Sequence, residues 1–93
     1  MINREMNKNM NEIILKTKIQ VIIMGSKHKD EYFDVTKDIL FNQYKISNLI
    51  KEGKFAEARA VFNDSIKLIE KKIDIQRVVL AEINEKDKKF LLN

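Results

Sequence analysis

The side chains that could perform chemistry are few and scattered in this sequence. His28 is the single histidine and no cysteine is present, so neither thiolates nor paired imidazoles are available for a transition-metal site. None of Ser26, Ser47 and Ser65 has a histidine at the spacing of a nucleophile motif. General acid–base catalysis by His28 would need a pocket that nothing in the sequence specifies. We therefore expect no catalytic residue, no metal ligand and no cofactor, and a chain that is not an enzyme.

Three aspartates form the one regular array of charged side chains. Asp30, Asp34 and Asp38 are four residues apart, which places them on one face of a helix. Such a ridge could bind a cation or a basic surface of a partner. Calcium sites, however, usually draw their oxygen ligands from a loop. Acidic residues near the start of a helix are also stabilised by its dipole, so we interpret the ridge as a solvated face.

The charge distribution weakens a nucleic-acid interpretation. The net charge is +4, but acidic residues are interleaved with the lysines throughout the chain. Only three of the eighteen basic residues are arginines, the type best suited to phosphates and base edges. A surface that follows a phosphate backbone usually gathers its basic residues on one face. Mixed surface charge is the better description.

Helical periodicity dominates the second half of the chain. No glycine or proline follows Gly53, and apolar residues recur every three or four positions. One helical face then carries Ala58, Phe62, Ile66, Ile69, Ile73, Gln76, Leu80 and Ile83. This predicts one continuous helix over 55–90. A preceding helix is predicted over 27–52, with Ser26 as its cap and Gly53 as the residue that ends it.

The first 24 residues allow two interpretations. Residues 2–13 keep a helical spacing, whereas over 15–23 apolar residues alternate with Lys16, Lys18 and Gln20, which is the period of a strand. We favour a helix over 2–24 and keep a strand at 15–23 as the alternative. The predicted fold is all-α: a single domain over 1–93, built as a three-helix bundle or helical hairpin with a long C-terminal helix.

Residues 49–68 resemble one tetratricopeptide-type helical hairpin. Gly53, Phe55, Ala58 and Phe62 stand where that family places its turn glycine, an aromatic, a packing alanine and the aromatic of the second helix. Ser65 replaces a usual alanine, and the pattern occurs once, whereas solenoids are built from several repeats. The resemblance implies protein binding, and no ligand residue is carried over.

The predicted helix lengths do not match. A helix over 27–52 is about 39 Å long and one over 55–90 about 54 Å. The end of the longer helix should therefore stay uncovered. The side chains expected to form a partner or dimer interface there are Val79, Leu80, Ile83, Phe90 and Leu91. A homodimer through this end is favoured over docking of another protein.

The leading functional prediction is a non-enzymatic protein–protein interaction module. It would be a small regulator, co-chaperone or inhibitor in the cytoplasm, with no membrane segment. The abundance of Lys, Ile and Asn, which have AT-rich codons, hints at a low-GC bacterium or a mobile element. The alternative is a regulator resembling the ribbon-helix-helix repressors, in which Lys16, Lys18 and Gln20 would project from a paired strand into a DNA groove.

Overall fold

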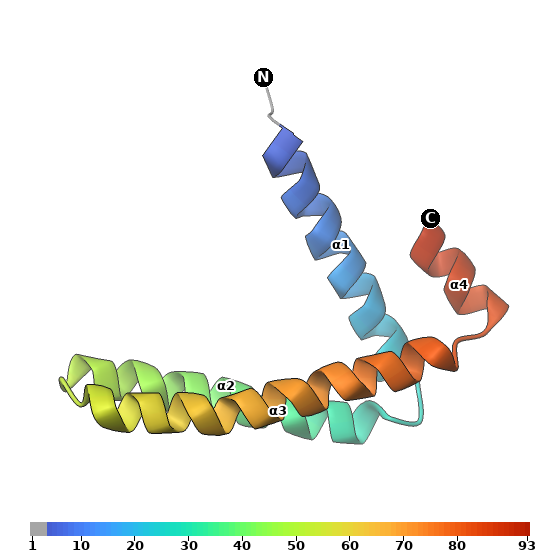
Figure 1. Ribbon diagram of the computed structural model, residues 1–93. Coiled ribbons are helices and arrows are strands. Elements are labelled where there is room, and N and C mark those ends of the chain that lie inside the picture. The colour runs from blue at the N-terminus through green and yellow to red at the C-terminus, as the bar shows by residue number, and fades with distance from the viewer. Residues whose placement is uncertain (1–3) are drawn as a thin grey trace.

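The computed structural model describes residues 4–93, with side chains from Asn9 onward, and this part of the chain forms four helices. Their bounds are α1 Arg4–Met24, α2 Lys29–Lys51, α3 Phe55–Ala81 and α4 Glu85–Leu92. α2 and α3 lie side by side as a long arm, and α1 and α4 rise from one end of it, so the chain has the outline of an L (Figure 1). The molecule measures 49 × 43 × 14 Å. The all-α prediction is confirmed for the described residues.

The arm is an antiparallel helical hairpin with a regular seam. The seam residues are spaced alternately by three and four positions, which keeps them on the facing sides of two packed helices. All of them are buried or half-buried: Tyr32, Val35, Ile39, Asn42, Ile46 and Leu49 on α2, and Ala58, Val61, Ser65, Leu68, Lys72, Ile75 and Val79 on α3. The small Ala58 and Ser65 let the two helices approach closely.

Gly53 makes the turn at the tip of the arm. Its φ of 74° lies in the left-handed region, where a residue with a Cβ is disfavoured. The turn is closed by the Gly53 amide, which donates to the Ile50 carbonyl over 3.0 Å, and the Lys54 amide, which donates to the Leu49 carbonyl over 2.8 Å. The predicted role of Gly53 as a helix-ending residue is confirmed.

The core lies at the corner of the L, where all four helices meet. Its buried residues are Ile22, Ile23, Tyr32, Val35, Ile39, Ile75 and Val79, and Ile19, Leu68, Ile83 and Leu91 pack against them. Ile23 is completely buried. The Lys72 ammonium lies 5.4 Å from the centre of the Tyr32 ring, in a cation–π contact at the edge of this core.

The N-terminal segment corrects two expectations. Residues 15–23 belong to α1, so the strand alternative is wrong and the favoured helix is confirmed from Arg4 onward. The predicted start of that helix at residue 2 lies outside the described residues. α1 also leaves the arm near its own C-terminus instead of lying along the hairpin (Figure 1). Of the two predicted arrangements, the helical hairpin is therefore present as α2 and α3, and α1 crosses it at one end instead of completing a three-helix bundle.

The prediction of one continuous C-terminal helix is wrong. α3 ends at Ala81 and the chain turns back to form α4, although no glycine or proline lies in between. The Asn84 side chain accepts a hydrogen bond of 2.8 Å from the Asp87 amide and so caps α4. The turn also brings Ile83 and Leu91 onto the core, and this burial stabilises the bend.

The glycine at the tip provides a first test of this fold. Gly53→Ala places a Cβ in a left-handed conformation, so we expect the free energy of unfolding to fall by about 1 kcal/mol. Gly25→Ala is the matched control, because a Cβ there meets only ordinary contacts, the nearest at 3.6 Å. Urea denaturation measures both variants. Equal stability of the two would contradict the described tip.

Candidate interaction surface

α3 carries two apolar stripes, and only one of them is covered within one copy of the chain. The seam stripe packs against α2. The second, the outer stripe, consists of Phe55, Arg59, Phe62, Ile66, Ile69, Ile73, Gln76 and Leu80. Its central members remain open to solvent, with Phe62 53%, Ile66 38%, Ile69 39% and Ile73 40% exposed. Each stripe contains two polar residues, Ser65 and Lys72 in the seam stripe and Arg59 and Gln76 in the outer stripe, so the uncovered stripe is about as apolar as the covered one.

Exposed apolar residues of α2 extend this surface. Phe33, Leu40 and Ile50 each directly follow a seam residue of α2, so they are rotated from the seam by about 100° around the helix axis. The residues of the outer stripe are rotated from the seam of α3 in the same sense. Because the two helices are antiparallel, equal rotations bring both sets to the same side of the hairpin. We define the arm face as the exposed apolar residues on this side: Phe33, Leu40, Ile50, Phe55, Phe62, Ile66, Ile69 and Ile73.

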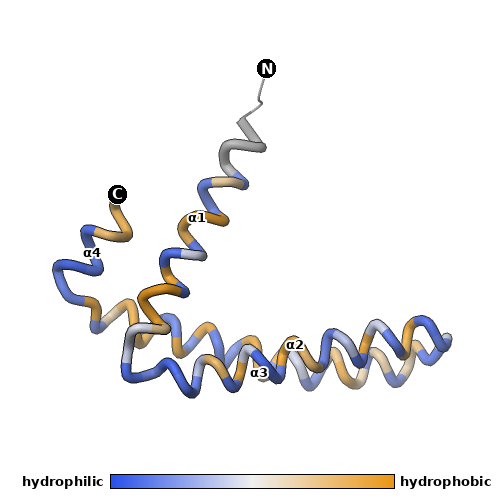
Figure 2. Tube along the Cα trace, turned by 180° about the vertical axis from the view of Figure 1, so that it is seen from behind, coloured by the Kyte–Doolittle hydropathy of each residue, from blue (hydrophilic) through white to orange (hydrophobic). Residues whose placement is uncertain are grey.

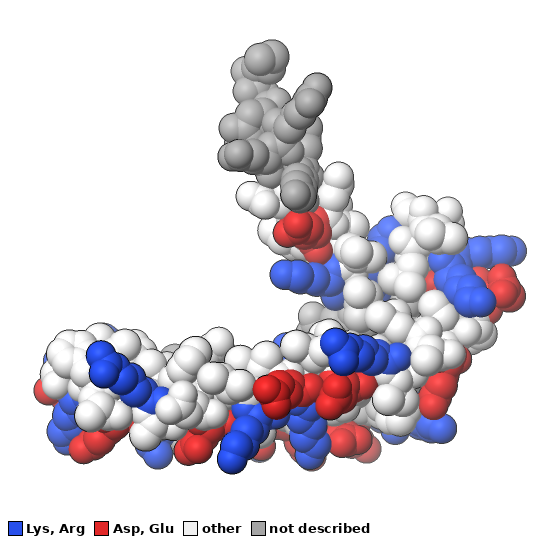
Figure 3. Space-filling model, viewed as in Figure 1, with Lys and Arg blue, Asp and Glu red and all other residues white. Residues whose placement is uncertain are grey.

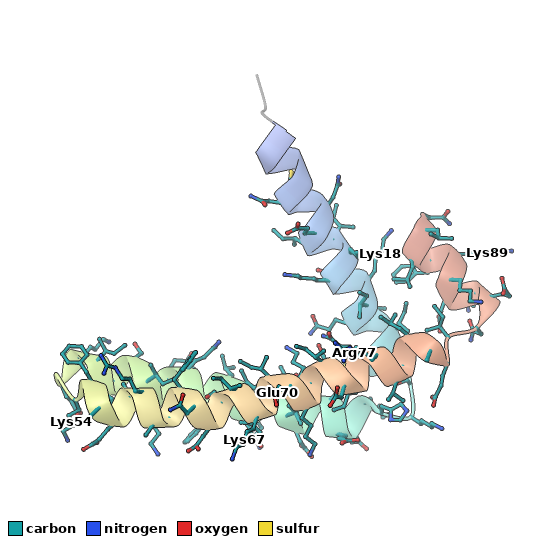
Figure 4. The ribbon with its side chains drawn as sticks, in the orientation of Figure 1. Lys18, Lys54, Lys67, Glu70, Arg77 and Lys89 are labelled. Atoms are coloured by element: carbon teal, nitrogen blue, oxygen red, sulfur yellow. The ribbon has the colours of Figure 1, made fainter. Side chains whose placement is uncertain are left out.

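The opposite side of the arm is charged. There the Lys71 ammonium and the Glu31 carboxylate lie 3.9 Å apart and connect α3 to α2. In Figure 3, charged side chains gather along the edge of the arm that faces away from α1, and much of the other edge carries none. Lys67 projects on the charged side in Figure 4. The hairpin therefore has one charged side and one apolar side.

α1 carries a further uncovered surface. Met10, Ile14, Val21 and Met24 recur at helical spacing and are 40–57% exposed. They lie on the side of α1 opposite Ile19 and Ile23, which face the core. We call these four residues the α1 stripe. Figure 2 shows hydrophobic residues recurring along the coloured part of α1 and along both helices of the arm.

The residues predicted as an exposed interface lie elsewhere than expected. Val79 is 3% exposed and belongs to the core, and Ile83 and Leu91 are half-buried against it. Leu80 is half-buried, and Phe90 is 40% exposed with the Lys18 ammonium 5.8 Å from its ring centre. The expected uncovered overhang is therefore absent, because the bend before α4 folds it back.

The residues of the DNA-binding alternative are not all brought to one face. On the helix α1, Lys16 and Gln20 are four residues apart and share a face, whereas Lys18, two residues from each, points in a different direction. Lys18 faces α4 and Phe90 (Figure 4). The paired ribbon from which these side chains were expected to project does not occur in residues 4–93.

The polar residues singled out in the sequence make contacts of a structural kind. His28 Nε2 lies 3.4 Å from a carboxylate oxygen of Glu82, and Lys27 Nζ lies 3.9 Å from the same oxygen. These contacts connect the α1–α2 turn to the end of α3. Among the described side chains, no group of three or more His, Asp or Glu residues is placed to hold a metal ion. No helix in the described part of the chain is both long enough and apolar enough to cross a membrane.

The arm face and the α1 stripe were not identified from the sequence as interaction sites. A signal was present, since Phe33, Phe41 and Tyr44 widen the apolar stripe of α2 beyond what one neighbour covers. In α1, residues 13–24 carry apolar side chains on all sides of the helix, more than its own fold can cover.

Comparisons with models of protein families, with curated proteins and with solved structures find no match for this chain. The resemblance of residues 49–68 to a tetratricopeptide-type hairpin therefore stays a prediction.

The bend before α4 can be tested through its cap. Asn84→Ala removes the side-chain acceptor of the Asp87 amide, so we expect about 1 kcal/mol less stability and faster hydrogen exchange of the α4 amides. Asn63→Ala, on an exposed position of α3, is the matched control and should leave α4 unchanged. Unaltered protection of α4 in Asn84→Ala would show that the cap does not hold the bend.

Proposed function

We propose that this chain is a non-enzymatic protein–protein interaction module, a small regulator, co-chaperone or inhibitor that acts by binding a partner protein. The observation that carries this proposal is the amount of apolar surface that one copy leaves uncovered. Isolated exposed apolar residues are normal, but contiguous apolar surfaces on a soluble fold mark sites of association. The chain has two such surfaces, the arm face and the α1 stripe.

The shape of the molecule supports the same proposal. The arm presents a long, flat side on which a second helical element can lie, as in the helix-in-groove mode of recognition. The α1 stripe stands apart from the arm on a helix that contacts its own fold mainly near its C-terminal end (Figure 1). A second surface on a projecting helix is suited to a separate partner. We place the regulatory contact there.

The experiment is a pull-down from the native host with mass spectrometry, comparing the wild type with Ile14→Asp plus Val21→Asp. Burying an unpaired aspartate when the partner binds costs several kcal/mol of binding free energy. We therefore expect at least a hundredfold weaker capture of the specific partner. Lys16→Asp is the matched control, because it changes the charge of the same helix at an exposed polar position. Equal capture by the double variant would refute the α1 stripe as the binding site.

A further inference from the structure

We propose that the arm face is the interface with a second copy of this chain, packed antiparallel so that two hairpins form a four-helix bundle. This inference builds on the proposed function, since it assigns one of the two uncovered surfaces to self-association and leaves the α1 stripe for another protein. It replaces the dimer expected through the C-terminal end, where Val79, Ile83 and Leu91 lie in or against the core.

The accessible surface indicates that the fold of one copy is incomplete. The chain exposes 7674 Å². A folded monomer of 11.0 kDa is expected to expose about 5,600 Å². The excess of about 2,000 Å² falls within the area that each chain of an obligate homodimer buries, about 1,000–2,500 Å². The radius of gyration of 16.6 Å agrees, because a compact chain of this length would have about 12 Å.

The small core favours a second copy over an occasional foreign partner. Only the corner of the L is well buried, and the outer half of the arm has Ala58 and Ser65 as its buried residues. A core of this size gives a small domain little stability of its own. The partner that buries the arm face must therefore be available whenever the chain folds. A second copy meets this condition, since every copy of the chain is synthesised along with others.

The composition of the arm face is compatible with pairing to itself. A two-fold interface brings the same patch of both copies together, so like charges inside the patch would repel. Arg59 is the one charged residue in the outer stripe of α3, and it lies near the tip of the arm. All members of the arm face are uncharged.

The L shape selects the antiparallel orientation. α1 and α4 rise from the arm on the side of its less charged edge (Figures 1 and 3). In a parallel pair, both copies would carry these helices at the same end, where each would meet the other arm. In an antiparallel pair, the tip of each arm points toward α1 of the other copy, and the two shapes fit.

This orientation gives an approximate register. The outer stripe of α3 is most exposed from Phe55 to Ile73, so full antiparallel overlap has its midpoint near residue 64. Phe62 then lies opposite Ile66 of the second copy, and Phe55 opposite Ile73. The two Arg59 residues are separated by about 15 Å along the helix axis and do not oppose each other.

The test is sedimentation equilibrium of the full chain, for which we expect a particle of twice 11.0 kDa at micromolar concentration. Ile66→Asp plus Ile69→Asp should weaken self-association at least a hundredfold, because four carboxylates would enter one apolar interface. Lys67→Asp lies on the same helix but on the charged side, and it should leave the association unchanged. A monomeric wild type, or a double variant that still dimerises, would overturn the proposal.

A second measurement covers the case in which the double variant does not fold. The thermal midpoint of the wild type should rise with protein concentration, because dissociation accompanies unfolding. Spin labels on Lys54→Cys, in a chain with no other cysteine, should lie about 30 Å apart in the antiparallel dimer. A distance below about 20 Å would refute the orientation, and a concentration-independent midpoint would refute the dimer.

The two proposals fail separately. Loss of the dimer with partner capture through the α1 stripe intact would refute self-association and leave the proposed function standing. A dimer that captures no specific partner would refute the function and leave the interface standing.

Discussion

The seam between α2 and α3 is the contact on which the rest of this structure depends. It holds the arm straight over the length of both helices, and its residues alternate by three and four positions in the manner of a coiled coil. Because the seam covers only one stripe of α3, large apolar side chains such as Phe62, Ile66 and Ile69 stay outside it. Those side chains are consequently displayed on one side of the hairpin, and the charged residues are displayed on the other.

The corner of the L contains most of the buried apolar residues. In the far half of the arm only Ala58 and Ser65 are fully buried, and the larger buried residues gather where α1 crosses the hairpin. Ile22 and Ile23 of α1 supply this core, and α4 closes it with Leu91. The ends of α1, α2 and α3 thus share one small core with α4, and the greater part of α1 and the arm stands outside it (Figure 1).

The helices and their first turn could be predicted from the sequence, and the arrangement of the helices could not. Gly53 marked the tip because a left-handed turn selects glycine, and helical spacing marked the apolar face of α3. That spacing identifies a stripe but not its neighbour, so it does not show that Phe62, Ile66 and Ile69 stay exposed. The bend at 82–84 has no glycine or proline. Its signal is Asn84, whose side chain caps α4 by accepting from the Asp87 amide, but a single asparagine does not by itself mark the start of a helix.

The amino-acid composition of the arm face also determines how the stability of a complex formed through it depends on temperature. Its eight side chains are aliphatic or aromatic hydrocarbons, with no polar group among them. Removing such a surface from water lowers the heat capacity and is driven by entropy near room temperature. The driving force therefore weakens on cooling. A complex formed through this face is held together less firmly in the cold than in the warm, unlike one built on ion pairs and hydrogen bonds.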